Sequence, residues 1–288
     1  MEIRHLDHPL SDRERAELLF QGDLLIFRNI DAMKELIDAA DQLLRTELNG
    51  LEPVSAQHHL SREQFLEKAG RAQTAFRKDP AMRAIFFRAL AQCGVDLSQA
   101  CYDHFPMRIV PFSDSHNGAL RAAIDHHRDT WGANIHSQQN WWAPIYPLEP
   151  ERSIAFYPDY WQTPLANNTA SWSFEDYLAT RAETANERQV AYPSAPHPTE
   201  LVDERNVLKM QLEPGDILCF SSAHLHASVV NSTDAARVSV EMRTVHLPDL
   251  TEHRQAPNVD NEADTPMYQW FKTIEGRIPL PQMLESTH

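Results

Sequence analysis

The spacing of apolar residues changes at about residue 102, and this change restricts the chain to a mixed fold. Before that point apolar side chains recur at helical spacing over 11–21, 31–48 and 61–92, the last stretch being two helices separated near Asp79-Pro80. After it the segments are short, rich in β-forming residues and separated by Pro, Gly, Asn and Asp. The sequence therefore predicts an α+β fold with a mainly β core and N-terminal helices packed on one face.

Local signals set the expected boundaries of these elements. Ser11 followed by Glu14 predicts a capped helix start, and Asp31 is the expected cap of the second helix. A short apolar strand is expected at Leu24–Phe27, and a short aromatic helix at Met267–Ile274. The strands predicted after residue 102 are Met107–Pro111, Trp141–Tyr146, Ser153–Tyr157, Val207–Leu212, Asp216–Phe220, His226–Val230 and Arg237–Val245.

The 288 residues suit one large domain or two small ones. We predict a single domain over 1–288, with a helical part at about 1–100, a β core at about 102–247 and a tail with a short helix at 248–288. A division into two domains near residue 105 remains the alternative. The three prolines of Tyr192–Asn206 predict a long loop, which is either a lid or a surface connection.

The charge of the chain indicates what kind of partner it binds. The formal net charge is -15 and the pI is about 5.4, so the surface repels nucleic-acid phosphates and anionic lipid headgroups. We therefore expect a small-molecule substrate, with no nucleic acid and no membrane as partner. The sequence leaves the oligomeric state open.

The cysteines and the apolar segments indicate a cytoplasmic protein. Cys93, Cys101 and Cys219 form no C-x-x-C pair and are odd in number, which disfavours a disulfide framework or a thiolate zinc site. The first residues show no apolar secretory segment, and no apolar run approaches the ~20 residues of a membrane span.

The tripeptide His127-Arg128-Asp129 is the first candidate for chemistry. On an extended segment residues i and i+2 point to the same face, so the imidazole and the carboxylate would converge. These are two of the three ligands of a 2-His-1-carboxylate facial triad, which leaves positions open on iron(II). Taken alone, the tripeptide is equally compatible with a surface histidine beside a solvated aspartate.

A second motif begins with a strand that leads to His226 and returns through Arg237-Val238-Ser239-Val240-Glu241. Alternation places Arg237, Ser239 and Glu241 on one face of the returning strand. A buried arginine is costly unless it meets an anion, and a guanidinium can hold a carboxylate through two parallel hydrogen bonds. The alternative is an exposed Arg237–Glu241 ion pair.

The two motifs together resemble the phytanoyl-CoA dioxygenase-like family of Fe(II)/2-oxoglutarate-dependent oxygenases. The family pattern has His127-x-Asp129, a distal His226, an asparagine five residues later at Asn231, and Arg237-x-Ser239 eleven residues later. The resemblance covers roughly residues 20–247. It also includes the segments Gly22–Phe27, Trp141–Leu148, Ser153–Pro158 and Pro214–Phe220.

This resemblance implies a double-stranded β-helix, a cupin-like jelly-roll barrel with the metal at its open mouth. It places iron(II) on three catalytic ligands, His127, Asp129 and His226. It places the cosubstrate 2-oxoglutarate against three further residues, Arg237, Ser239 and Trp142.

The implied reaction consumes O2 and 2-oxoglutarate, releases succinate and CO2, and oxidises a C–H bond of a small metabolite or natural-product intermediate. Some relatives that halogenate carry Gly or Ala in place of the carboxylate, so Asp129 favours hydroxylation here. Desaturation and cyclisation remain possible outcomes, and the substrate and the position oxidised stay undetermined.

Several alternatives stay open in the sequence. His224 is two residues from His226 and could be the distal ligand, and Arg108 is either an anion contact or part of an ion pair. A cupin-like dioxygenase or hydrolase without cosubstrate and a non-catalytic binding protein are the competing functions. Six aromatic residues follow the first motif, and we expect most of them in the core of the barrel. Those at the mouth of the barrel would suit a ring or an amphiphilic substrate. The six residues are Trp131, Trp141, Trp142, Tyr157, Tyr160 and Trp161.

Overall fold

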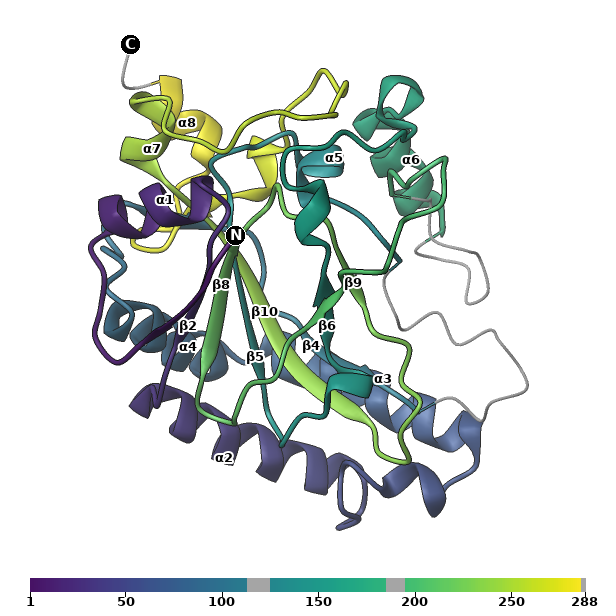
Figure 1. The fold of residues 1–288 in the computed structure, drawn as a ribbon. Helices are drawn as coiled ribbons and strands as arrows, with labels where there is room; N and C mark the ends of the chain where they lie inside the picture. The colour runs from purple at the N-terminus through teal and green to yellow at the C-terminus, as the bar shows by residue number, and fades with distance from the viewer. Residues whose placement is uncertain (113–124, 185–194, 286–288) are drawn as a thin grey trace.

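The computed structural model describes residues 1–112, 125–184 and 195–285, and the chain has an α+β architecture (Figure 1). The helices are α1 (Asp12–Phe20), α2 (Asp31–Glu47), α3 (Arg62–Lys78), α4 (Pro80–Gln92), α5 (Asp129–Ala133), α6 (Phe174–Thr184), α7 (Leu247–Thr251) and α8 (Leu280–Glu285). The strands are β1 (Ile3–Leu6), β2 (Leu24–Phe27), β3 (Ala100–Tyr102), β4 (Met107–Val110), β5 (Gln139–Pro144), β6 (Ile154–Phe156), β7 (Leu208–Lys209), β8 (Ile217–Ser221), β9 (His226–Ser228), β10 (Arg237–His246) and β11 (Lys272–Thr273).

The strands form two separate sheets. The larger sheet has eight strands in the order β1-β2-β8-β5-β10-β3-β11, and β4 also pairs with β10. Its pairings are antiparallel except for β1 with β2. The smaller sheet has the order β7-β6-β9. Within the described ranges neither sheet closes on itself, so the strand pairing gives two open sheets rather than one continuous barrel.

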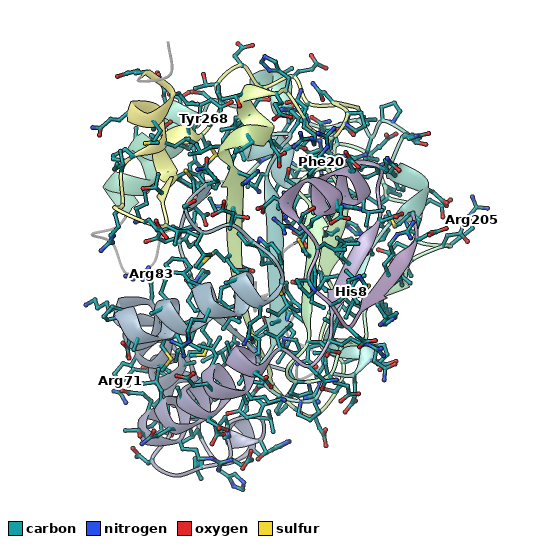
Figure 2. The ribbon with its side chains drawn as sticks, turned by 90° about the vertical axis from the view of Figure 1, so that its left-hand side faces the viewer. His8, Phe20, Arg71, Arg83, Arg205 and Tyr268 are labelled. Atoms are coloured by element: carbon teal, nitrogen blue, oxygen red, sulfur yellow. The ribbon has the colours of Figure 1, made fainter. Side chains whose placement is uncertain are left out.

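Alternation along the central strands gives the larger sheet two different faces. Trp141, Cys219 and Val240 lie on the face covered by α2, α3 and α4, in one continuous apolar cluster. The opposite face packs against the smaller sheet, where the rings of Phe156 and Phe220 are 4.9 Å apart. Figure 2 shows the helical side, with Arg71 of α3 and Arg83 of α4, lying away from Arg205 on the other side of the molecule. The N-terminal helices α2, α3 and α4 are therefore on one face of the larger sheet, as predicted.

The predicted helix starts are confirmed except at Asp31. Ser11 Oγ accepts a hydrogen bond from the Glu14 amide, and the Glu14 carboxylate accepts one from the Ser11 amide, which completes a capping box at α1. The N-cap of α2 is Ile30, which makes no side-chain cap bond. Asp31 is instead the first helical residue, and its carboxylate binds Lys34 at 2.8 Å. Here it favours the helix through its charge at the N-terminal end.

The predicted aromatic helix at Met267–Ile274 is wrong. This segment contains the short 3-10 helix η5 (Tyr268–Trp270) and then β11, which pairs with β3 at the edge of the larger sheet. Pairing with an open sheet edge satisfies the backbone of the segment, while Phe271 is buried among apolar neighbours. Tertiary packing has overridden the local helical pattern.

Two further predictions concern loops and membrane spans. Of the predicted loop Tyr192–Asn206, residues 192–194 lie outside the described residues, and 195–206 contain no helix and only an isolated bridge between Asn167 and Pro198. Among the helices of the described ranges, none is long and apolar enough to cross a membrane.

Gly94 lies just after α4, where the backbone passes close to Leu10 of the N-terminal segment. Its φ is +94°, and a Cβ there would lie 2.1 Å from the carbonyl oxygen of Leu10. Gly215 has a similar φ of +105° but open space around it.

We expect Gly94→Ala to lower the free energy of unfolding by about 2–5 kcal/mol, from left-handed strain plus steric overlap. Gly215→Ala should cost only about 1–2 kcal/mol. Urea denaturation measures both, and equal losses would contradict the predicted overlap at Leu10.

Candidate metal centre

The side chains of His127 and Asp129 meet that of His226, which lies about 100 residues further along the chain, at one end of the two sheets. The possible ligand atoms of His127, Asp129 and His226 all lie within 4.8 Å of one another. Each imidazole Nε2 is 3.8 Å from an oxygen of Asp129, His127 from Oδ1 and His226 from Oδ2. The two imidazole rings have their centroids 4.2 Å apart. The sequence motifs therefore meet in space.

Main-chain pairing holds the two histidines in place. The amide of His127 donates to the carbonyl of His226 and the reverse bond also forms, both at 3.0 Å. Arg128 between the two motif residues is extended, with φ -107° and ψ 137°, and Asp129 then begins α5. The extended backbone points His127 and Asp129 to one side, which is the geometry expected from alternation.

The Arg128 side chain extends the other way and anchors the motif. It is buried and donates to the carbonyl oxygens of Ala223 at 2.5 Å and Tyr160 at 2.6 Å. Its Nε lies 3.1 Å from Asp260, whose other oxygen accepts a 2.7 Å bond from Trp131. The middle residue of the motif therefore fixes the backbone that carries its two neighbours.

Contacts between the Nδ1 atoms and main-chain carbonyl oxygens set the orientation of both imidazole rings. The Nδ1 of His127 lies 2.8 Å from the carbonyl oxygen of Asp125, and that of His226 lies 3.0 Å from the carbonyl of His224. A carbonyl oxygen only accepts, so each neutral ring carries its proton on Nδ1. The lone pair on each Nε2 is then free to face the shared space, the arrangement typical of metal-binding histidines.

The Asp129 carboxylate is held between two strands. Its Oδ2 accepts a short hydrogen bond from Asn140 on β5, and its Oδ1 is 3.9 Å from Arg243 on β10. Arg243 is itself fixed by Asp103, at 2.6 Å through Nε. Asn140 and Arg243 are direct cross-strand neighbours, so the sheet register places both donors at the same carboxylate.

The charge states suit a cation between these side chains. Burial lowers the pKa of His226 to about 3, so this imidazole is neutral at pH 7. Burial raises the pKa of Asp129, but His226, His127 and Arg243 more than offset this and hold the pKa below its ordinary value. The group therefore offers a carboxylate and a neutral imidazole, which are the donor states that metal binding requires.

His224 lies apart from this group. Both of its ring nitrogens face main-chain oxygens, Nδ1 at 3.1 Å from Ser221 and Nε2 at 3.0 Å from Gly22. The side chain is fully buried, and burial lowers the pKa of His224 to about 4. His224 thus ties the segment before β2 to β8, and His226 is the histidine that faces Asp129.

A second cluster of polar groups lies between the two sheets. Arg237 is buried and donates to the Ser153 carbonyl at 2.8 Å and to Ser228 Oγ at 3.3 Å. In the described part of the chain, Arg237 Nε and the hydroxyls of Ser239 and Ser153 have no hydrogen-bond partner. Burial and nearby Arg108 lower the pKa of Arg237 to about 10, so the guanidinium stays charged at neutral pH. A buried cation with spare donors is suited to an anionic ligand.

The alternative of an Arg237–Glu241 ion pair is wrong, because Glu241 pairs with Arg108 instead. The distance between Glu241 and Arg108 is 2.5 Å, and the two side chains are 27% and 34% exposed. Trp142 lies directly opposite Glu241 in the sheet register, so it shares the face that carries Arg237 and Ser239.

Most of the aromatic residues singled out in the sequence belong to the core. Tyr160 is half-buried, and the others are between 0% and 7% exposed: Trp131, Trp141, Trp142, Tyr157 and Trp161. Sequence reasoning missed four polar residues at the two clusters: Asp103, Asn140, Ser228 and Arg243. Alternation from Arg237, Ser239 and Glu241 already places Arg243 on the same face, so that signal was present in the sequence.

No family model matches the chain, and no curated protein sequence matches it either. Its structure has similar solved structures, among them EvdO2 from Micromonospora carbonacea var. aurantiaca, at 14% identity over 84% of this chain and 94% of that chain, with a TM-score of 0.44. AviO1 from Streptomyces viridochromogenes Tue57 is 14% identical over 87% of this chain and 98% of that chain, with a TM-score of 0.41.

The epimerase SnoN is a third similar structure, described in complex with Fe3+, alpha ketoglutarate and nogalamycin RO. It is 12% identical over 81% of this chain and 83% of that chain, with a TM-score of 0.42. Similarity at this level leaves the function of the present chain to be inferred from its own residues.

Proposed function

We propose that this protein is a non-heme iron(II) oxygenase that uses 2-oxoglutarate and O2 to oxidise a C–H bond of a small molecule. The observation that carries the proposal is the pairing of two sites on one short strand. β9 begins at His226, beside the other two candidate ligands, and ends at Ser228, which binds the buried Arg237. A metal site and an anion site are therefore adjacent between the same two sheets.

The residues present fit iron(II). Two imidazoles and one carboxylate are the donor set of the facial triad, and this set leaves coordination positions for small ligands. Asn140 and Arg243 would hold the Asp129 carboxylate in place, while Asp125 and His224 would orient the imidazoles through their carbonyls. Such outer contacts tune affinity and geometry at metal sites.

The residues present also fit 2-oxoglutarate. Two residues along a strand span roughly 7 Å, so a five-carbon dicarboxylate can extend from the His226 end of β9 to Arg237 at the Ser228 end. Arg237 would hold its far carboxylate, and the unpartnered hydroxyl of Ser239 would donate to it. Trp142 on the same face would line the cosubstrate site.

We also propose that the two sheets are the two halves of a jelly roll within a single domain. Each half would contribute four strands. One half would be formed by β4, β10, β5 and β8, and the other by β7, β6, β9 and the His127 segment that bridges to β9. One apolar cluster joins the N-terminal helices to the larger sheet, from Leu6 to Ala256, which supports a single folding unit.

The chain's own residues divide the work in this proposal. When bound, iron with 2-oxoglutarate and O2 would supply the oxidising power, with succinate and CO2 as coproducts. His127, Asp129 and His226 would hold the metal, and Arg237 with Ser239 would orient the cosubstrate. The buried rings of Phe156 and Phe220 exclude water from the space between the sheets. We favour hydroxylation or a related oxidation over halogenation because the carboxylate of Asp129 is present.

Calorimetry with the full chain tests this assignment. We expect Co(II), used anaerobically in place of iron, to bind at one site, and 2-oxoglutarate to bind much more tightly after the metal than before it. Absence of both binding events would indicate a non-catalytic protein. Metal binding without any 2-oxoglutarate binding would favour a cupin-like enzyme that needs no cosubstrate.

Asn140 provides a sharper check on the metal site. Replacing it with Leu removes the donor to Asp129 Oδ2, so we expect the affinity for Co(II) to fall about 10–100-fold. Asn206 makes a similar amide–carboxylate bond to Asp159 at 2.8 Å on the surface, and Asn206→Leu should leave the affinity unchanged. Equal Co(II) affinity in both variants, measured by calorimetry, would show that Asn140 does not support the centre.

A further inference from the structure

Aromatic side chains border the candidate centre on two sides. Trp270 of η5 lies beneath the guanidinium of Arg243, with its ring 6.0 Å from Cζ, and Arg243 approaches Asp129. Trp172 lies over α5, where a Cβ added at Gly132 would be 3.9 Å from its ring. Gly132 is three residues after Asp129 on that helix and therefore shares its face. Each ring is therefore one residue removed from Asp129, Trp270 through Arg243 and Trp172 through Gly132 of α5.

These rings form a connected group, called here the aromatic shelf and made of Trp172, Phe174, Tyr177 and Trp270. Trp270 lies 5.4 Å from Phe174 and 6.2 Å from Tyr177, and Trp172 lies 5.8 Å from Tyr177. Phe174 is buried, whereas the other three keep part of their surface exposed. The shelf therefore presents a partly accessible aromatic surface beside the candidate centre.

The position of the shelf is at one end of the sheets. Figure 1 shows α6, which carries Phe174 and Tyr177, at the same end of the strands as α5. Tyr268, at the start of η5, lies at that end too, far from Arg71 of α3 in Figure 2. The shelf therefore lies at the same end of the strands as Asp129, the first residue of α5.

A cavity adjoins the far part of the shelf. It has a volume of about 240 Å³ and is lined by two aromatic rings, two alanines, three hydroxyl groups and three carboxylates: Trp172, Phe174, Ala170, Ala263, Thr169, Ser173, Thr265, Glu175, Glu262 and Asp264. This volume is just below the range of ligand pockets, roughly 300–1,000 Å³, so it suits a small ring system. Aromatic rings beside carboxylates and hydroxyl groups suit a flat ring that carries a hydroxyl group, because a carboxylate can accept a hydrogen bond from that hydroxyl.

We infer that the aromatic shelf is the substrate-binding surface and that it takes a molecule with one or two fused aromatic rings bearing a hydroxyl group. The role as substrate rests on the proposed oxygenase function, but the binding of rings to the shelf does not. Two series of contacts join the shelf to the centre. One runs from Asp129 through Arg243 to Trp270, and the other runs from Asp129 along α5 to Trp172. The competing role is packing of α6 against the body of the protein.

The test compares two probes on the full, metal-free chain. 2-Naphthol is flat and aromatic, and decahydro-2-naphthol has the same skeleton without aromatic faces. By calorimetry we expect 2-naphthol to bind at least about 5-fold more tightly. Trp270→Leu and Tyr177→Leu should each weaken 2-naphthol about 3–10-fold, while Trp270→Phe should largely retain binding. Phe87→Leu is the matched control, since Phe87 is a partly buried ring on the helical face and should have no effect.

Each outcome decides one of the two proposals. Equal affinity for the two probes, or 2-naphthol binding that neither shelf variant weakens, would overturn the inference. Thermal unfolding identifies any variant that fails to fold, and the comparison of the two probes on the parent chain then carries the test. Shelf-dependent binding in a chain that binds no Co(II) would keep the shelf and refute the metal site. Co(II) binding without any 2-naphthol binding would do the reverse.

Discussion

Asp129→Ala is expected to abolish metal binding at the centre, with a loss of more than about 100-fold in Co(II) affinity. Contacts behind a ligand typically contribute 10–100-fold, and Asp129 is the one proposed ligand that carries a charge. The fold should persist because Arg243 keeps its bond to Asp103 when Asp129 is removed. Anaerobic calorimetry measures the affinity, and thermal unfolding checks the fold.

The control for this variant is Asp125→Ala. Asp125 is exposed and supports His127 through its main-chain carbonyl rather than its side chain, so removing the carboxylate should leave Co(II) affinity intact. Full metal affinity in Asp129→Ala would show that the carboxylate is not a ligand. The facial triad would then have to be abandoned.

Arg237→Met is expected to weaken 2-oxoglutarate binding about 100-fold or more while leaving metal affinity unchanged. Truncating one partner of a buried, hydrogen-bonded charge pair costs about 2–5 kcal/mol. Arg237→Lys keeps the charge but loses the planar fork, so its loss should be intermediate. Calorimetric titration of 2-oxoglutarate into the Co(II)-loaded protein measures all three forms.

Stability separates this role of Arg237 from a purely structural one. The guanidinium is buried with an unpartnered Nε in the described part of the chain, so an apolar side chain of similar length should be tolerated. We expect Arg237→Met to unfold at a temperature close to that of the parent protein. A strongly destabilised variant with unchanged 2-oxoglutarate affinity would mean that Arg237 serves the fold instead.

The sequence predicted the elements whose signals are local. Ser11 with Glu14 and Asp79 with Pro80 set helix boundaries because capping depends on adjacent residues. Alternation likewise predicted that Arg237 and Ser239 share a face, since both lie on β10. These inferences need no knowledge of the neighbouring strands.

Features that depend on register or on distant packing could not be derived in this way. Asn140 reaches Asp129 only because β5 is aligned with β10 so that Asn140 lies opposite Arg243. The local pattern of Met267–Ile274 predicts a helix, but part of this segment is a strand that pairs with β3. That pairing cannot be read from the segment itself, because β3 lies some 170 residues away in the chain.

The aromatic residues show the same limit. Trp131 and Trp141 are core residues with no exposed surface, whereas the rings beside the centre, Trp172 and Trp270, are about 100 residues apart in the sequence. Spacing along the chain cannot identify such a pair, because Trp270 is related to Asp129 only through Arg243 of β10 and Trp172 only through α5.

The production of succinate from 2-oxoglutarate, measured under air with the iron-loaded protein and 2-naphthol as a trial substrate, is the most direct test of the proposed function. We predict succinate formation that requires both iron and O2 and that disappears in Asp129→Ala. Oxygen-dependent turnover that proceeds equally well without 2-oxoglutarate would contradict the proposed oxygenase.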